Sequence, residues 1–372
     1  MGYLSAMNQP QKYARCMVFA GGGFRFGIYL GMYAAARDAG RAPDLLLATC
    51  GGALAAAIIQ ALPDDVQRKA WLSSPQMFEF WRGLQPAPQA RISRTLLQAA
   101  RRKLSWAPAP VLPDLFNDYL FEVPHHLPLP TPAAQSEVAV ATIGGKLLYG
   151  PNEVGQVRGT RKLFAQTVFC EARAAALLQG MRSPFADPRW GNHAMADAVL
   201  TDTTMPLDAA ACMSIIDFYY FPCYSYGADN YLGGVVDLFP IEVARQLADE
   251  VMIEFKESFD QTFSIPAWRT VLGLDGNQRM RQVNGEFADV WFDTSDITAA
   301  LPYQQIGKRL DWFNNRIALN VPDSYATFVQ YMDAQWQYGY QRGMEALRRP
   351  QPHDISSMRN PDRYNQAEPC AS

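Results

Sequence analysis

Apolar runs alternate with helical patterns along the first part of the chain. Residues 16–20 are apolar and end in Gly21–Gly23, which is typical of a buried strand that enters a tight turn. The segment after these glycines favours a helix, because it is rich in Ala, Leu, Met and Tyr and ends at Gly40. The order then repeats, so the expected elements are strand 16–20, helix 24–39, strand 44–49 and helix 53–62. Two successive strand–helix units predict an α/β fold with a mainly parallel sheet.

The pattern changes between residues 64 and 133. Residues 64–100 favour helix and lead into an amphipathic stretch, 91–103, with five basic residues. This stretch could contact a membrane surface or an acidic partner, and the simpler interpretation is a solvated helix face. Residues 107–133 contain seven prolines and predict an irregular excursion. We therefore expect 64–133 to be a helical and Pro-rich insertion, able to act as a lid, within a single domain spanning 1–348.

The second half of the chain returns to strand and helix patterns. Strands are expected at 137–143, 251–255 and 290–292, and helices at 239–248 and 323–347, with Asp323 as the N-cap of the last helix. After Arg348 the chain becomes polar and Pro-rich. The tail 349–372 is therefore predicted to be flexible.

Composition places the chain among packed globular proteins. Of its 372 residues, 49% are hydrophobic and 19% are charged, and the formal net charge is −3. This charge argues against an extended phosphate-binding surface, so nucleic acid is not expected as a partner. No apolar run reaches the length of a membrane span, and the first residues lack the pattern of a secretory signal. A cytoplasmic location is expected, whereas the oligomeric state stays open.

Cysteine and histidine spacing predicts neither a metal site nor a cofactor. None of the six cysteines forms a CxxC pair, and the four histidines are scattered. The even number of cysteines does not by itself imply disulfides in a chain of this length.

The strongest local signal is Cys50, which follows the predicted strand 44–49 and precedes a helix. Small residues around it allow the sharp turn that would lift a nucleophilic side chain clear of the sheet. A thiol at a helix N-terminus is expected to have a lowered pKa, because the helix dipole stabilises the thiolate. The alternative is a small buried cysteine packed at the turn.

A second signal is the glycine run Gly21–Gly23 at the start of the first helix. Successive backbone N–H groups there suit a phosphate or the oxyanion of an acyl-transfer intermediate. The run lacks the Lys-Ser/Thr of a P-loop and the GxGxxG spacing, which disfavours nucleotide binding. Arg25 could steer a negatively charged substrate, or it could anchor the loop through carbonyl groups.

Together with a third segment, these features resemble the patatin-like phospholipases. The resemblance is carried by residues 20–27, 48–52 and 231–240, in the order of that family's GGGxRG loop, GxSxG nucleophile turn and Asp-Gly-Gly turn. It extends over about residues 14 to 348 and implies a three-layer fold with helices on both faces of the central sheet. It also implies an oxyanion hole at Gly22, Gly23 and Phe24, a nucleophile at residue 50, and substrate contacts at Arg25 and Gly51.

The sequence departs from the family at the residues that carry its chemistry. Cys50 replaces the nucleophilic serine, Ala48 replaces the first glycine of that motif, and Leu232 stands at the position of the catalytic aspartate. Phe26 replaces a loop glycine, and Asp217 stands where the family usually has proline. The family's Ser–Asp dyad therefore cannot be carried over to this chain.

A general base must come from elsewhere if Cys50 is catalytic. The candidates are Asp217, which lies among aromatic residues, and His193, with Asp229 and Asp237 less favoured. For His193 the alternative is an ordinary loop histidine.

The sequence leaves three functions open. An acyl-cysteine is a thioester, which reacts with amines and thiols more readily than with unactivated water, so acyl transfer from a carrier-protein or coenzyme A thioester, or from a lipid ester, is expected. A lipid acyl hydrolase using Cys50 is the first alternative. The second is a catalytically inactive protein that retains the fold for binding.

Overall fold

The structure, a computed structural model, describes residues 10–88, 90–95, 97, 108, 110–124, 126–129, 136–256, 264–304 and 307–348. Its centre is a mixed sheet in the order β11-β10-β1-β2-β5-β6-β7, with β9 paired to β5 and β8 to β9. The strands are β1 (Tyr13–Phe19), β2 (Leu45–Ala48), β5 (Ala139–Leu147), β6 (Phe164–Phe169), β7 (Leu200–Asp202), β8 (Tyr224–Tyr226), β9 (Asp229–Leu232), β10 (Ala248–Phe255) and β11 (Val290–Asp293).

The five strands from β11 to β5 pair in parallel, whereas β6 runs antiparallel to β5. The sheet is therefore mainly parallel, and the predicted α/β class is confirmed. Parallel strands place their carboxyl ends at one edge of the sheet, and the loops after β1, β2 and β10 meet at that edge.

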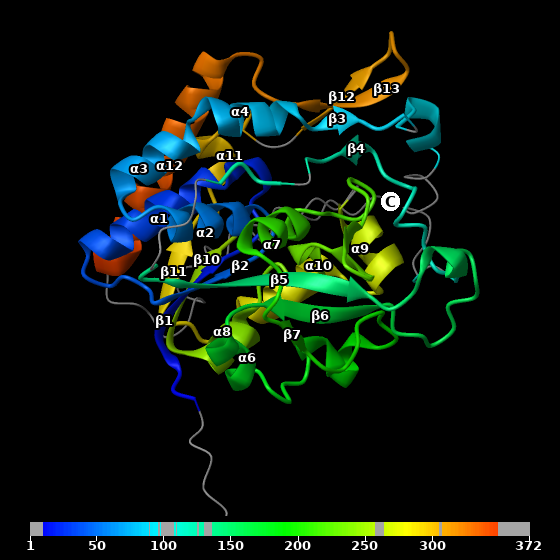
Figure 1. The fold of residues 1–372 in the computed structure, drawn as a ribbon, viewed down its shortest axis with the longest axis horizontal. Helices are drawn as coiled ribbons and strands as arrows, with labels where there is room; N and C mark the ends of the chain where they lie inside the picture. The colour runs from blue at the N-terminus through cyan, green and yellow to red at the C-terminus, as the bar shows by residue number, and fades with distance from the viewer. Residues whose placement is uncertain are drawn as a thin grey trace, which may run out of the picture.

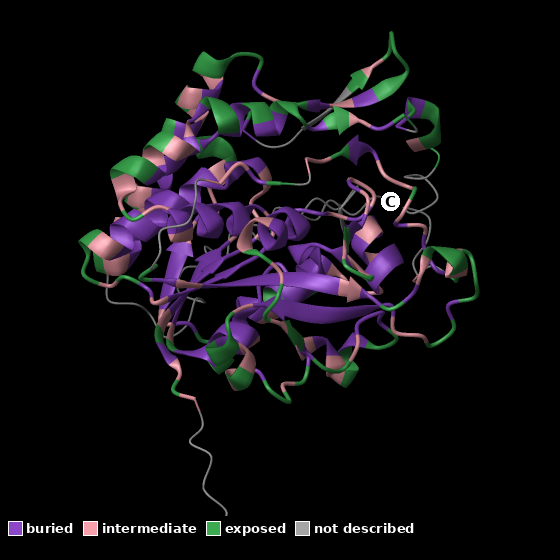
Figure 2. Cartoon of the chain, viewed as in Figure 1, coloured by how far each residue is buried: buried purple, intermediate pink, exposed green. Residues whose placement is uncertain are grey.

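Helices cover both faces of the sheet (Figure 1). The longest are α1 (Gly27–Asp38), α2 (Gly51–Ala61) and α12 (Tyr325–Arg348), which lie on one side together with α7 (Leu207–Ser214). On the other side lie α6 (Ala172–Leu177) and α8 (Ile241–Leu247). The remaining helices are α3 (Asp65–Leu72), α4 (Pro75–Arg82), α9 (Ser264–Leu272), α10 (Gly276–Val283) and α11 (Ile297–Ala300). Figure 2 shows that the buried residues follow the sheet and the helix faces turned toward it.

Glycines allow α1 and α12 to pack with their backbones in contact. A Cβ atom on Gly31 would lie 2.1 Å from the carbonyl oxygen of Trp336, and one on Gly339 would lie 1.9 Å from that of Ile28. Only glycine fits at such an approach. This contact fixes the start of α1, which follows the glycine loop directly.

Several predicted elements differ from the observed ones at their ends. The first helix begins at Gly27, because residues Gly23–Arg25 form a 3-10 turn, η1. The N-cap of α12 is Ser324 rather than Asp323, since the Ser324 hydroxyl accepts from the Thr327 backbone at 3.1 Å. The helical pattern of 64–100 breaks into α3 and α4, which Ser73 and Ser74 separate.

The insertion packs over the helices on the side of α2 and α7. It contains α3, α4 and the short pair β3 (Gln85–Pro86) and β4 (Phe121–Glu122), and β3 contacts β13 of the hairpin β12 (Gly307–Asp311) and β13 (Arg316–Asn320). Figure 1 shows these elements as a separate layer above α2 and α7. Most of the basic stretch 91–103 and all of the tail 349–372 lie outside the described residues.

Candidate active site

Cys50 lies at the carboxyl end of β2, between this strand and α2. Its backbone has φ 49° and ψ −127°, a conformation that costs energy for any residue with a Cβ atom. A Cβ on Gly52 would lie only 2.4 Å from the Phe19 carbonyl oxygen, so the start of α2 presses against β1. The turn at Cys50 is therefore as sharp as the small residues around it predict.

The glycine loop lies directly beside this turn. The backbone N–H groups of Gly51 and Gly23 hydrogen-bond to the Cys50 thiol. The two backbones are in contact, because a Cβ on Gly51 would lie 2.9 Å from the Gly23 nitrogen. Gly23 itself has φ +53°, which glycine adopts without strain. Two amide donors therefore converge on the Cys50 sulfur, beside the place where an acyl group on it would lie.

Gly22 and Phe24 flank Gly23 on the same loop and have different surroundings. A Cβ on Gly22 would lie 3.2 Å from the Tyr29 ring, and the Phe24 ring is buried edge-on against Trp81 at a centroid distance of 4.8 Å. The segment that carries Trp81 therefore packs against the glycine loop.

The third glycine pair, Gly233 and Gly234 of segment 231–240, packs against the Cys50 turn. A Cβ on Gly234 would lie 2.7 Å from the Cys50 nitrogen, and one on Gly233 would lie 2.3 Å from the Ser214 carbonyl oxygen. Leu232 is fully buried in β9, opposite Gly145 of β5. The backbone role of this segment is thus retained, whereas the side chain at position 232 cannot accept a proton.

Ser214, at the end of α7, holds the backbone of the turn. Its hydroxyl accepts from the Cys50 N–H at 2.9 Å and donates to the Ile143 carbonyl at 2.9 Å. Both hydrogen bonds of the fully buried hydroxyl are therefore used to fix the strained residue. No pattern along the chain indicated this role, because a serine at the end of an Ala-rich helix is common.

Asp217 follows α7 by three residues and lies within electrostatic reach of the thiol. Burial, and next the negative charge of Asp217, raise the pKa of Cys50 to about 11. The amides of Gly51 and Gly23 and the charge of Lys256 act in the opposite direction and lower this pKa, but by less. The expectation that the helix N-terminus would lower this pKa is wrong, since burial and a carboxylate outweigh two amides. At such a pKa roughly one thiol in ten thousand is ionised at pH 7. A catalytic Cys50 would therefore need a base.

A buried polar network supports the glycine loop from below. The Lys256 ammonium donates to the Gly21 carbonyl and, at 3.1 Å, to the Tyr29 hydroxyl, and it pairs with Glu254 at 3.1 Å. The Tyr29 hydroxyl in turn donates to Glu254 at 2.7 Å, and Glu254 also accepts from Thr294 at 2.5 Å. Sequence reasoning missed these residues, although a glutamate inside the apolar run of β10 is a detectable signal.

Comparison with known proteins decides the family. The model of the patatin-like phospholipases matches residues 17–245, which include the glycine loop, the Cys50 turn and the third glycine pair. The chain belongs to the patatin-like phospholipase family. The crystal structure of the type III effector protein ExoU is similar at 13% identity and a TM-score of 0.27, covering 90% of this chain and 54% of that one. The chain thus spans about half of that protein's length. No curated protein matches the chain.

Patatin-like phospholipases are lipid acyl hydrolases, and membership in this family supports an enzyme. Among the described residues, no group of three or more His, Cys, Asp or Glu side chains is arranged to hold a metal ion. No helix in the described part is long and apolar enough to cross a membrane.

His193 lies away from the Cys50 thiol. It is buried beside Lys162, whose ammonium lies 3.2 Å from its Nε2, and its Nδ1 accepts from the Met195 N–H at 3.2 Å. Burial, and next Lys162, lower its pKa to about 4. Phe164, a neighbour of His193, pairs with Leu147 of β5. Ala48, at the end of β2 before Cys50, pairs with Thr142 of the same strand. Five residues of strand, roughly 16 Å, separate these two levels of the sheet. The structure therefore does not bring His193 to Cys50.

Two other carboxylates considered as bases are engaged elsewhere. Asp229 forms an ion pair with Lys146 at 2.7 Å. Asp237 is fully buried and pairs with Arg279 at 3.3 Å. Of the four candidates, Asp217 is the one whose charge acts on the Cys50 thiol.

Arg25 anchors the loop in this structure. Its guanidinium is buried and donates to the Leu301 carbonyl at 3.1 Å, and burial lowers its pKa. This contact fits the anchoring role that the sequence left open beside substrate binding.

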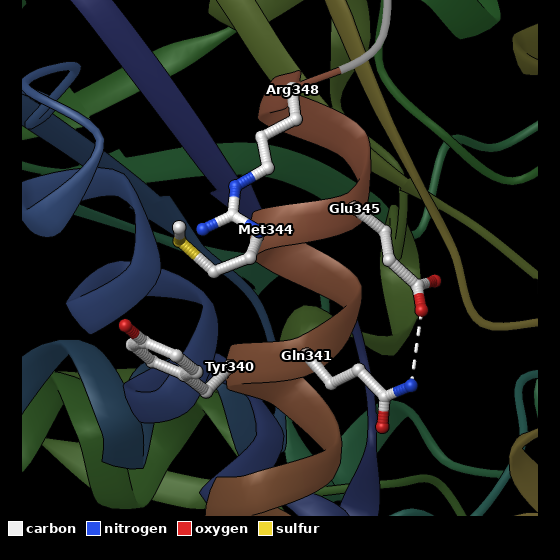
Figure 3. A pocket seen from close by; sticks show the side chains of 5 residues that line it. All are labelled: Tyr340, Gln341, Met344, Glu345 and Arg348. Atoms are coloured by element: carbon white, nitrogen blue, oxygen red, sulfur yellow. Dashed lines mark hydrogen bonds between the residues drawn. The ribbon is translucent and has the colours of Figure 1, made fainter.

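A surface hollow lies well away from Cys50, on the last turns of α12 (Figure 3). Its volume is about 490 Å³, and its lining residues are Tyr340, Gln341, Met344, Glu345 and Arg348. The Tyr340 hydroxyl donates to Asp38 at the end of α1 at 2.8 Å, whereas the glycine loop lies at the start of α1. The two ends of α1, Gly27 and Asp38, are eleven helical rises, roughly 16 Å, apart. The hollow is therefore not part of the candidate active site.

Proposed function

We propose that this protein transfers acyl groups through a thioester on Cys50, with Asp217 as the general base. The supporting observation is the position of the thiol, which accepts from the amides of Gly51 and Gly23 and lies in the field of Asp217. A nucleophile, oxyanion donors and a carboxylate are the parts that acyl transfer needs.

In the acylation step, Asp217 takes the thiol proton as the sulfur attacks the acyl carbonyl carbon. The C–S bond forms, and the developing oxyanion is held by the amides of Gly23 and Gly51. Collapse of this intermediate breaks the bond to the leaving group, which receives the proton from Asp217. In the second step Asp217 takes a proton from the acceptor, which attacks the thioester carbonyl carbon. The C–S bond then breaks, and Asp217 returns the proton to the Cys50 sulfur.

Transfer is favoured over hydrolysis by the chemistry of the intermediate. A thioester reacts with thiols and amines more readily than with water, which needs stronger activation. Leu232, at the position of the family's aspartate, cannot supply that activation. The donor that fits this chemistry is a carrier-protein or coenzyme A thioester, or a lipid ester.

The second candidate is a lipid acyl hydrolase that uses the same thiol. Membership in the patatin-like phospholipase family favours it, because that activity is the family's own. It differs from the first in one step only, since water rather than another nucleophile would then accept the acyl group.

Intact-mass measurement on the full chain with acyl-coenzyme A or a phospholipid tests both. We expect an acyl adduct on the wild type that is absent in Cys50→Ala and retained in Cys170→Ala, a partly exposed cysteine outside the site. An adduct released faster by an added thiol or amine than by water supports transfer, and rapid release of free fatty acid supports hydrolysis. A wild type that forms neither adduct nor product would refute both and favour a binding protein.

A further inference from the structure

The hairpin of β12 and β13 carries two aromatic side chains at its tip. Trp312 is 70% exposed and Phe313 is completely exposed, at 103%. Both lie in the turn between Asp311 and Arg316, which are paired across the hairpin. Figures 1 and 2 show the hairpin extending from the layer that contains β3, with exposed residues toward its end. Two adjacent aromatic side chains in water form an exposed apolar patch, and contiguous patches often mark interaction sites.

Hydrogen bonds fix the turn at the tip of this hairpin. The Asn314 backbone donates to Asp311 Oδ1 at 3.1 Å, and its side chain donates to Asp311 Oδ2 at 2.8 Å, which closes the turn. Next to the turn, Ile317 is buried and its N–H donates to the Ala90 carbonyl at 3.1 Å. The aromatic side chains are thus presented by a fixed hairpin, and their exposure follows from its geometry.

Basic residues surround this tip. Arg316 is exposed and forms a β-bridge with the exposed Arg91, the first residue of the basic stretch seen in the sequence. Arg94, half-exposed, follows one turn later and lies 3.6 Å from Asp118. A local excess of positive charge on a chain of net charge −3 indicates an anionic partner surface.

We propose that the tip of this hairpin, Trp312 and Phe313 with Arg91 and Arg316 behind it, docks the protein on an anionic lipid surface. A convex tip offers no groove for a partner's side chains, whereas a fluid lipid layer can close around it. Tryptophan and phenylalanine partition into the boundary between headgroups and acyl chains, and arginine beside them pairs with lipid phosphates.

This surface lies on the same layer as the insertion that covers the candidate site. β3 of the insertion contacts β13, and the backbone N–H groups of Leu120 and Phe121 donate to the Tyr220 carbonyl at 3.2 and 2.8 Å. Tyr220 lies three residues after Asp217. Docking by the hairpin does not depend on the chemistry proposed for Cys50, because it concerns binding alone.

Vesicle flotation with the full chain tests the proposal. We expect the protein to float with vesicles that contain phosphatidylserine in phosphatidylcholine, and added salt to weaken the binding. The double substitution Trp312→Ser with Phe313→Ser should lower the partition coefficient at least about tenfold. Val66→Ser, which removes another exposed apolar side chain from α3, should leave it unchanged. Arg316→Glu should weaken binding to anionic vesicles.

The double variant should keep its thermal unfolding midpoint, since both side chains are exposed. Failure of the wild type to bind, or equal binding of the double variant, would overturn the proposal. Equal binding to phosphatidylcholine alone would overturn the assignment of an anionic surface. Self-association that the double variant abolishes, without vesicle binding, would assign the tip to a second copy of the chain and would also overturn it.

Discussion

Replacing Asp217 with Asn should separate the reactivity of the Cys50 thiol from turnover. The Asp217 charge is the second cause, after burial, of the raised thiol pKa of about 11. Removing a carboxylate whose charge acts on a neighbouring thiol lowers the pKa of that thiol by about one unit, which makes about ten times more thiolate at pH 7. Alkylation of Cys50 by iodoacetamide, which needs only the thiolate, should therefore become about tenfold faster.

Turnover should change in the opposite direction. If Asp217 takes the thiol proton during acylation, its loss removes general-base catalysis, which is worth about 10² to 10⁴ in rate. The gain in thiolate recovers only a small part of that loss. A variant with a more reactive thiol and a slower enzyme is a result that a purely structural role of Asp217 would not produce.

The assay follows alkylation at Cys50 by peptide mass spectrometry across a pH series, beside acyl transfer on the same samples. Wild-type alkylation should rise about tenfold per pH unit until the pH approaches the thiol pKa, and the variant should level off at a lower pH. Asp229→Asn, which removes a carboxylate paired with Lys146, is the matched control and should change neither rate. Alkylation that slows or stays unchanged in Asp217→Asn would refute the electrostatic reasoning.

Three substitutions and one titration test other parts of the structure. Gly234→Ala places a Cβ 2.7 Å from the Cys50 nitrogen, so acyl-adduct formation should fall by up to about a hundredfold; an unchanged rate would contradict this packing. Gly339→Ala should lower the free energy of unfolding by about 1–3 kcal/mol in urea titrations, whereas Gly285→Ala, with its nearest atom at 3.3 Å, should be tolerated. Arg279→Met leaves the fully buried Asp237 without its partner and should cost about 3–5 kcal/mol in the same assay. Burial raises the pKa of the thiols outside the site. These thiols therefore stabilise the folded state fully below pH about 8.5, the pKa of an unfolded thiol, and this stabilisation is lost as the pH rises. Equal urea midpoints at pH 7 and about 10 would contradict this.

The sequence alone was sufficient for the fold class and for the position of the sharp turn. Alternation of strand and helix patterns determines a parallel sheet, because parallel strands need crossover connections. Small residues at Gly51 and Gly52 are required where α2 begins against the glycine loop and β1, and this requirement is local enough to be visible along the chain. The helix boundaries were less well predicted, since the first residues of α1 form a 3-10 turn that composition does not distinguish from a helix.

Only the tertiary structure decided which side chains act on Cys50. Asp217 and His193 were both candidate bases along the chain, and the fold brings the charge of Asp217 to act on the thiol and holds His193 beside Lys162. The Lys256 network and the Ser214 hydrogen bond join segments more than 150 residues apart, which no local pattern encodes. The sign of the thiol pKa shift also depended on the fold, because desolvation is a property of what surrounds an atom and not of its neighbours in sequence.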